Sequence, residues 1–203
     1  MLRYYTWPYA LGGAQIYVHD VNGDGLPDIV ASLDAHGYGL AWFEQLPRSR
    51  GDHDIQFRPH FIMKAGPSGN SHQVSLTQLH ALSLVNLESS GAKDLITGKR
   101  FWAHGPEGPD PENNAAAVLY AFRPAHHGTR RVFFSPLLID NNSGVGTQIA
   151  TGDVNGDGLL DIVVSNKKGT FLFLQQKTAL SKEVRSTRYN FGAIQQEKRE
   201  VGF

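Results

Sequence analysis

Two nine-residue segments of the chain alternate oxygen-bearing side chains with turn residues and then lead into an apolar run. They are Asp20-Val-Asn-Gly-Asp-Gly-Leu-Pro-Asp28 and Asp153-Val-Asn-Gly-Asp-Gly-Leu-Leu-Asp161. Calcium is a hard cation that prefers carboxylate, amide and backbone oxygens in a flexible loop. Positions one, three, five and nine supply side-chain oxygens, and position seven supplies a backbone carbonyl. The sequence therefore predicts two Ca²⁺ sites, with ligands Asp20, Asn22, Asp24, Leu26 and Asp28 in one and Asp153, Asn155, Asp157, Leu159 and Asp161 in the other.

Two simpler interpretations explain these segments less well. An EF-hand loop requires a bidentate Glu at position twelve, but this position holds Ala31 or Val164 inside an apolar run. A plain hairpin turn explains the Asn-Gly and Asp-Gly dipeptides. It does not require carboxylates at positions one, five and nine in both copies. A calcium loop between two strands is therefore the favoured interpretation.

A third, degenerate copy lies between the two acidic segments. Alignment backward from the apolar run after Asp94 gives residues 86–94, which keep Gly91 at position six. The three segments begin at residues 20, 86 and 153, so they are 66 and 67 residues apart. This near-constant period indicates a repeat protein. The corresponding ligand positions hold Asn86, Glu88, Ser90 and Asp94, a less acidic set that we expect to bind calcium weakly or not at all.

The same order of strands surrounds each of the three segments. Alternating apolar residues precede each one, a nearly continuous apolar run follows, and a third apolar strand comes next. A fourth strand contains Pro59 or Pro136, which places it at a sheet edge because proline cannot donate to the ladder. We therefore predict an all-β fold, a β-propeller-like array of three four-stranded antiparallel blades.

The expected divisions of the chain follow from this strand order. Residues 1–13 form the edge strand of a preceding or closing blade, and residues 178–203 form a tail or a loose edge strand. The three blades span residues 14–65, 78–140 and 145–177. Because propellers have four to eight blades, we expect further blades in the parent chain or in a second copy of the chain.

The pattern Asp-x-Asn-x-Asp-Gly-x-x-Asp followed by Ile-Val, in a four-stranded repeat, resembles the FG-GAP or VCBS-type repeat of integrin-α-like propellers. The resemblance covers roughly residues 1 to 177 and is weakest in the middle copy. It implies that calcium acts as a structural clip, that ligands bind on the face opposite the calcium loops, and that the protein is extracellular or periplasmic.

Composition restricts the partners. The chain has 203 residues, with 19 Lys plus Arg against 19 Asp plus Glu, so no overall charge would attract nucleic acid. No apolar run is long enough for membrane insertion, and the first residues lack the hydrophobic region of a signal peptide. The absence of cysteine excludes disulfides and leaves the compartment open.

The loops after each second strand are expected on the face opposite the acidic segments. Loops on a rigid scaffold commonly carry binding sites. The candidate ligand-binding residues there are Asp34, His36, Lys99, Arg100, His104 and Lys167, with the proline-rich stretch 105–114 as a possible rim.

Two functions remain open. The favoured one is a non-enzymatic, calcium-binding structural or interaction module that binds a protein or a glycan. The alternative is a sugar-active lyase or hydrolase. It would use His36, His80 or His104 as acid/base groups or metal ligands, with Lys99 and Arg100 holding an anion. No standard catalytic motif supports this alternative.

Overall fold

The computed structural model of the chain describes residues 12–51, 54–66, 74–88, 91–127 and 131–176. These residues form three antiparallel sheets in which each strand pairs with the next one along the chain. The first sheet contains β1 (Ile16–His19), β2 (Asp28–Ser32), β3 (Leu40–Gln45) and β4 (Phe57–Met63). The second contains β5 (Leu82–Val85), β6 (Asp94–Gly98), β7 (Leu119–His127) and β8 (Arg131–Asp140). The third contains β9 (Ile149–Gly152), β10 (Asp161–Asn166) and β11 (Gly169–Phe173).

The prediction of an all-β, blade-like array is confirmed by this topology. The two proline-bearing strands, β4 and β8, lie at sheet edges, as the missing N–H of Pro59 and Pro136 requires. The third sheet has three strands within the described residues. The expected edge strand over residues 1–13 lies outside the described part of the chain except for its last two residues, of which Gly12 forms an isolated parallel bridge with Asp34. The expected tail from residue 178 lies outside the described part as well.

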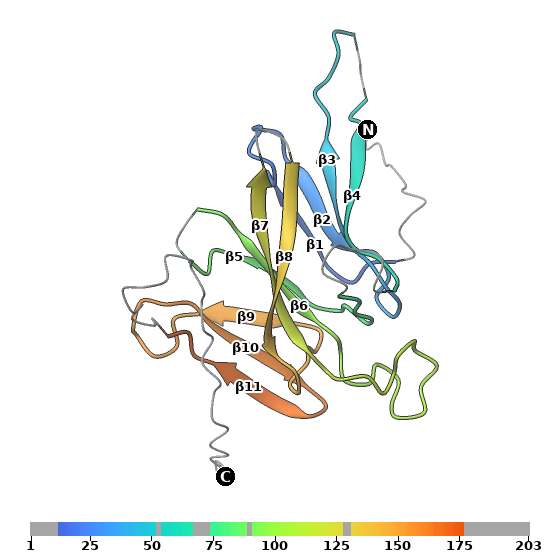
Figure 1. Ribbon diagram of the computed structural model, residues 1–203, viewed down its shortest axis with the longest axis vertical. Helices are drawn as coiled ribbons and strands as arrows, with labels where there is room; N and C mark the ends of the chain where they lie inside the picture. The colour runs from blue at the N-terminus through green and yellow to red at the C-terminus, as the bar shows by residue number, and fades with distance from the viewer. Residues whose placement is uncertain (1–11, 52–53, 67–73, 89–90, 128–130, 177–203) are drawn as a thin grey trace, which may run out of the picture.

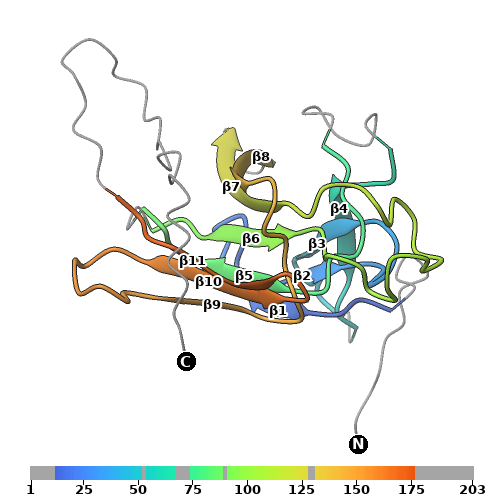
Figure 2. The same cartoon turned by 90° about the horizontal axis from the view of Figure 1, so that it is seen from below.

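Apolar side chains fill the spaces between successive blades. Between the first and second blades, Trp42 and Met63 pack with Leu82, Leu95 and Phe122. A second cluster joins the second blade to the third, and its largest members are Ile96, Leu119, Ile162, Val164 and Phe173. Figure 1 shows the sheets following one another along the molecule, and in Figure 2, which is seen from below, the same sheets overlap in the line of sight.

Hydrogen bonds across the blade boundaries fix the relative positions of the sheets. The Tyr17 hydroxyl donates to the Leu82 carbonyl at 2.9 Å, and the Leu82 N–H donates to the Gln15 side-chain oxygen at 2.9 Å. The Gln175 amide donates to the Leu87 carbonyl at 3.1 Å. Neighbouring blades are therefore held by polar bonds as well as by apolar packing.

The outer face of the first blade is apolar and exposed. Ile16 and Val18 are 67% and 73% exposed on the side of β1 that faces away from the second blade. Together with Ile29, Ala31 and Phe43 they line a groove of about 290 Å³. Ala31 and Phe43 on the same face are buried, so the exposed apolar surface lies along β1.

No helix within the described ranges has the length and apolar character needed to cross a membrane.

The backbone at Gly146 lies so close to the Ser165 carbonyl that a larger residue should destabilise the protein. A Cβ on Gly146 would lie 1.9 Å from the Ser165 carbonyl oxygen, whereas a Cβ on Gly152 meets nothing within 4 Å. Gly146→Ala should therefore lower the free energy of unfolding by about 1–3 kcal/mol through overpacking. Gly152→Ala should change it far less, as measured by chemical denaturation. Equal denaturation midpoints for the two variants would contradict this packing.

Candidate functional site

The acidic loops, residues 20–28 and 153–161, join the first and second strands of the first and third blades. In the first loop, Asp20 Oδ1 accepts the N–H groups of Gly23 and Asp24 at 2.8 and 3.1 Å, and Oδ2 accepts that of Gly25 at 2.8 Å. Asp153 accepts the corresponding three N–H groups at 2.7, 3.0 and 2.8 Å. The two glycines of the first loop have φ of 76° and 86°, a conformation that favours glycine. The same coiled loop is therefore built twice.

Further oxygens line each acidic loop. The Asp24 N–H donates to Asn22 Oδ1 at 3.0 Å, and the Leu26 N–H donates to Asp24 Oδ1 at 2.8 Å. Asn155 and Asp157 accept the equivalent bonds at 3.1 and 2.8 Å. Each carboxylate or amide oxygen has two lone-pair sites, so these bonds leave acceptor capacity for a cation. The all-oxygen donor set fits the chemistry of Ca²⁺.

The ninth residue of each acidic loop is a buried carboxylate. Asp28 is fully buried and accepts the Val21 N–H at 2.9 Å and the Gln45 N–H at 2.8 Å. Asp161 is fully buried as well and accepts the corresponding bonds, from Val154 at 2.8 Å and Gln175 at 2.9 Å. These bonds tie each loop to the third strand of its own blade, at the last residue of β3 in the first blade and two residues beyond β11 in the third.

Burial and negative charge both act on Asp28. Burial raises the pKa of this carboxyl, the two backbone N–H groups oppose the rise, and the charges of Asp24 and Asp20 add to it. A cation in the loop would compensate the charge that this arrangement concentrates.

In the middle loop, residues 86–94, an arginine compensates the negative charge of the buried carboxylate. Asp94 is 3% exposed, and its Oδ1 accepts the Nε–H of Arg123 at 3.1 Å. The same guanidinium forms an ion pair with Glu88 through Nη1. Gly91 has φ of 90°, close to the values of the sixth-position glycines in the acidic loops. Ser90 lies outside the described residues.

A single proline explains why Arg123 takes this position. Phe43 pairs with Ile29 in the first blade, and Phe122 pairs with Leu95 in the second, so Pro124 is the counterpart of Gln45. Proline has no N–H to donate to the buried carboxylate. Arg123 Nε supplies the missing donor and brings a positive charge with it.

At the other end of the blades, three side chains form a cluster that we call the His–Asp cluster: His36, His104 and Asp110. His36 Nδ1 lies 3.2 Å from Asp110 Oδ1, and His104 Nδ1 lies 3.0 Å from both carboxylate oxygens. The two imidazole rings stack with centroids 4.6 Å apart. The Asp110 side chain is 3% exposed, whereas those of His36 and His104 are 44% and 53% exposed. The cluster joins the loop after β2 to the loop after β6.

His80 and Arg100 adjoin this cluster. The His80 ring packs edge-on against His36 at 4.7 Å, and Arg100 Nη1 lies 3.4 Å from His80 Nε2. Burial, together with the positive charge of Arg100, lowers the pKa of His80 to about 4. His80 is therefore neutral near neutral pH. Burial would raise the pKa of Asp110, but the hydrogen bond and charge of His104, with those of His36, hold it below its ordinary value.

The remaining predicted ligand residues take supporting positions. Asp34 Oδ1 accepts the N–H groups of His36 and Gly37 at 3.0 and 2.9 Å and so shapes the turn that carries His36. Lys99 is buried, its Nζ donates to the carbonyls of Arg100 and Asn113, and burial lowers its pKa. Lys167 Nζ donates to the Trp102 and Ala103 carbonyls at 2.7 and 3.1 Å.

The structure adds three residues that the sequence did not predict at these sites. Asp110 stands between two prolines in the stretch that was assigned only a rim, and nothing in its local pattern marks it as buried. Gln78 is fully buried, and its side chain accepts the Ala103 N–H at 3.2 Å and donates to the Pro111 carbonyl at 3.5 Å. Arg123 could have been found, because Pro124 interrupts the pattern where the other blades have glutamine.

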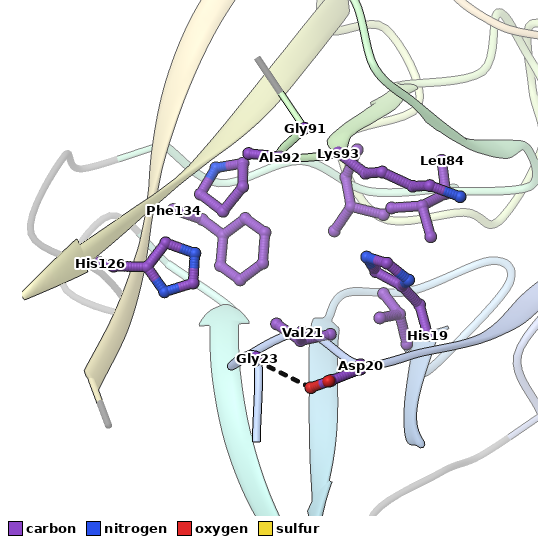
Figure 3. Close-up of a pocket in the computed structure, with 13 residues that line it drawn as sticks. His19, Asp20, Val21, Gly23, Leu84, Gly91, Ala92, Lys93, His126 and Phe134 are labelled. Atoms are coloured by element: carbon purple, nitrogen blue, oxygen red, sulfur yellow. Dashed lines mark hydrogen bonds between the residues drawn. The ribbon is translucent and has the colours of Figure 1, made fainter. Parts of the chain in front are cut away.

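A cavity of about 370 Å³ opens at the acidic-loop end, between the first and second blades. Figure 3 shows His19 and Lys93 on one side of it and His126 and Phe134 on the other, with Asp20 turned toward the Gly23 N–H. Burial and the charge of Lys93 lower the pKa of His19, while Asp20 opposes this effect. The cavity is thus separate from the His–Asp cluster.

Comparison with known proteins assigns part of the chain. The family model described as FG-GAP repeat matches residues 145–178, which include the second acidic loop and the third blade. This match supports the suspected resemblance and a structural or interaction module built from such repeats. A search of curated proteins finds no match.

The contact between Arg123 on β7 and the middle loop can be tested by mutation. Arg123→Met leaves Asp94 buried without its side-chain donor, so the free energy of unfolding should fall by about 1–3 kcal/mol. Arg58→Met is the matched control, because the Arg58 guanidinium is 59% exposed where it pairs with Glu44. That change should have little effect in urea denaturation. Equal losses in the two variants would rule out a special role for Arg123.

Proposed function

We propose that the protein is a calcium-binding structural and interaction module of the FG-GAP type. One observation carries the proposal: two loops 133 residues apart, starting at residues 20 and 153, repeat the same hydrogen bonds around the same oxygen-bearing residues. Each nine-residue loop contains both a buried carboxylate and exposed carboxylates. A divalent cation would neutralise their negative charge. Calcium would clip the first strand of a blade to the second and, through Asp28 or Asp161, to the third.

The middle blade would need no metal, because the Arg123 guanidinium occupies the corresponding carboxylates. We therefore assign calcium to two loops. Loops of this kind fill where calcium is abundant, at affinities of about 10⁻⁴ to 10⁻³ M for extracellular modules. FG-GAP repeats are typically extracellular, and we propose an extracellular or periplasmic location on that basis.

A protein or glycan partner would bind on the face of the His–Asp cluster. The loops of two blades meet there, and several polar groups remain exposed on it. The exposed apolar face of β1 would pack against a further blade, either in the parent chain or in a second copy, because exposed apolar patches of this kind mark interaction surfaces.

A second candidate function has a specific observation in its favour. His36, His104 and Asp110 lie within hydrogen-bonding range, with His80 and Arg100 beside them. A sugar-active lyase or hydrolase would use such a group for proton transfer. Turnover of an acidic or neutral oligosaccharide that His104→Ala abolishes would favour this candidate over a binding module.

Calcium binding can be counted directly. Isothermal titration of metal-free protein should find two sites, and Asp24→Ala or Asp157→Ala should each remove one of them. Ser90→Ala changes the same loop position in the middle blade and should leave the stoichiometry at two. Three equal sites, or two sites that survive both aspartate changes, would contradict the assignment.

Calcium should also stabilise the fold, because it binds the folded loops and not the unfolded chain. At free calcium about 100-fold above Kd, each filled site should raise Tm by about 5–10 °C. Differential scanning calorimetry with calcium and with excess EGTA measures the shift. An unchanged Tm would count against both sites.

A further inference from the structure

We propose that His36, His104 and Asp110 bind one divalent transition-metal ion of the Zn²⁺ class and leave a coordination position open. One ligand atom from each of these residues lies within 4.8 Å of the other two. The site is independent of the acidic loops, since it is built from different residues at the opposite end of the blades. Its donors also have different chemistry, because two of the three are imidazoles.

The spacing of the donors suits a small metal ion. Zn²⁺ bonds of about 2.0–2.1 Å at tetrahedral angles place neighbouring ligand atoms about 3.3 Å apart. The two His–Asp separations are 3.0 and 3.2 Å. The ligand atoms of all three residues lie within 4.8 Å of one another, so a small shift of the half-exposed imidazoles would bring both of them to bonding distance from one ion. Asp110 is buried and held by both histidines, so it would be the most rigid of the three ligands.

The donor set selects the class of metal. Imidazole suits Zn²⁺, Fe²⁺, Cu²⁺ and Ni²⁺, whereas Ca²⁺ and Mg²⁺ prefer oxygen ligands. Two histidines and one carboxylate form the protein ligand set of zinc sites that keep a fourth position for water or a ligand. The exposure of both imidazoles leaves that position accessible from solvent. A bound ion would therefore present a coordination site to a ligand on this face.

A supporting layer holds the ligands in place. Asp34 fixes the turn of His36, and the His80 ring packs edge-on against the His36 ring. The buried Gln78 amide bonds to Ala103 and Pro111, which are the chain neighbours of His104 and Asp110. Such outer contacts orient metal ligands and contribute to affinity.

Backbone strain is concentrated around the same residues. Within the described ranges, the non-glycine residues with positive φ are Gln78, Trp102 and Glu112, at 58°, 49° and 51°. Each lies two residues from His80, His104 or Asp110. Conformations of this kind persist where the surrounding structure enforces them, and they gather at functional sites. The positive φ values are thus a second observation, separate from the donor geometry, that points to a functional site here.

Zinc titration tests the proposal on untagged, calcium-saturated protein, in which the acidic loops are blocked. Calorimetry should find one Zn²⁺ per chain. His104→Ala and His36→Gln should each weaken binding by at least about 100-fold, since loss of a ligand exceeds the 10–100-fold typical of outer contacts. Co²⁺ used in place of Zn²⁺ should give visible d–d absorption that both variants lose.

His126→Ala is the matched control. His126 is an exposed histidine on β7 that lines the cavity at the acidic-loop end, so its loss should leave the zinc affinity unchanged. Both site variants remove exposed side chains, and their unchanged calcium-dependent Tm would verify folding. The double variant Asp24→Ala, Asp157→Ala should lose calcium and keep zinc, so failure of one proposal is separable from failure of the other.

Three results would overturn the proposal. These are no zinc binding by the unaltered protein, full affinity in both His36→Gln and His104→Ala, or an equal loss in His126→Ala.

Discussion

A buried carboxylate at the start of the second strand is the constraint on which each blade depends. Asp28, Asp94 and Asp161 are at most 3% exposed, and each is bound by groups from the loop before it and the strand beyond it. A buried charge is costly unless it is paired and hydrogen-bonded. Two blades use a backbone N–H at or just beyond the end of the third strand together with an acidic loop whose oxygens fit calcium, and the middle blade uses an arginine. The chain thus contains two solutions to one electrostatic requirement.

The same architecture separates the molecule into two ends with different tasks. Short loops between the first and second strands gather at one end and hold carboxylates. The loops between the second and third strands lie at the other end, where the β2–β3 loop and the long β6–β7 loop bring together His36, His104 and Asp110. Apolar packing between blades makes this meeting possible, because the three residues come from two different sheets. The rigid sheets therefore position residues that lie 74 positions apart in the chain.

Local patterns made much of the fold predictable. Alternating apolar residues, the recurrent acidic segments and the prolines of β4 and β8 each report on their own stretch of chain, and these signals were enough to predict the antiparallel strand order. Asp110 and Gln78 carried no such signal, since their burial depends on how two loops pack against each other. The position of Arg123 also depends on tertiary structure, although Pro124 shows in the sequence that a backbone donor is missing.

Anomalous diffraction from crystals grown in calcium would locate each ion in its loop without relying on stoichiometry. The account predicts anomalous peaks inside loops 20–28 and 153–161 and none inside loop 86–94, where Arg123 contacts Asp94 and Glu88. A peak in the middle loop with Arg123 displaced, or the absence of peaks from both acidic loops, would contradict it.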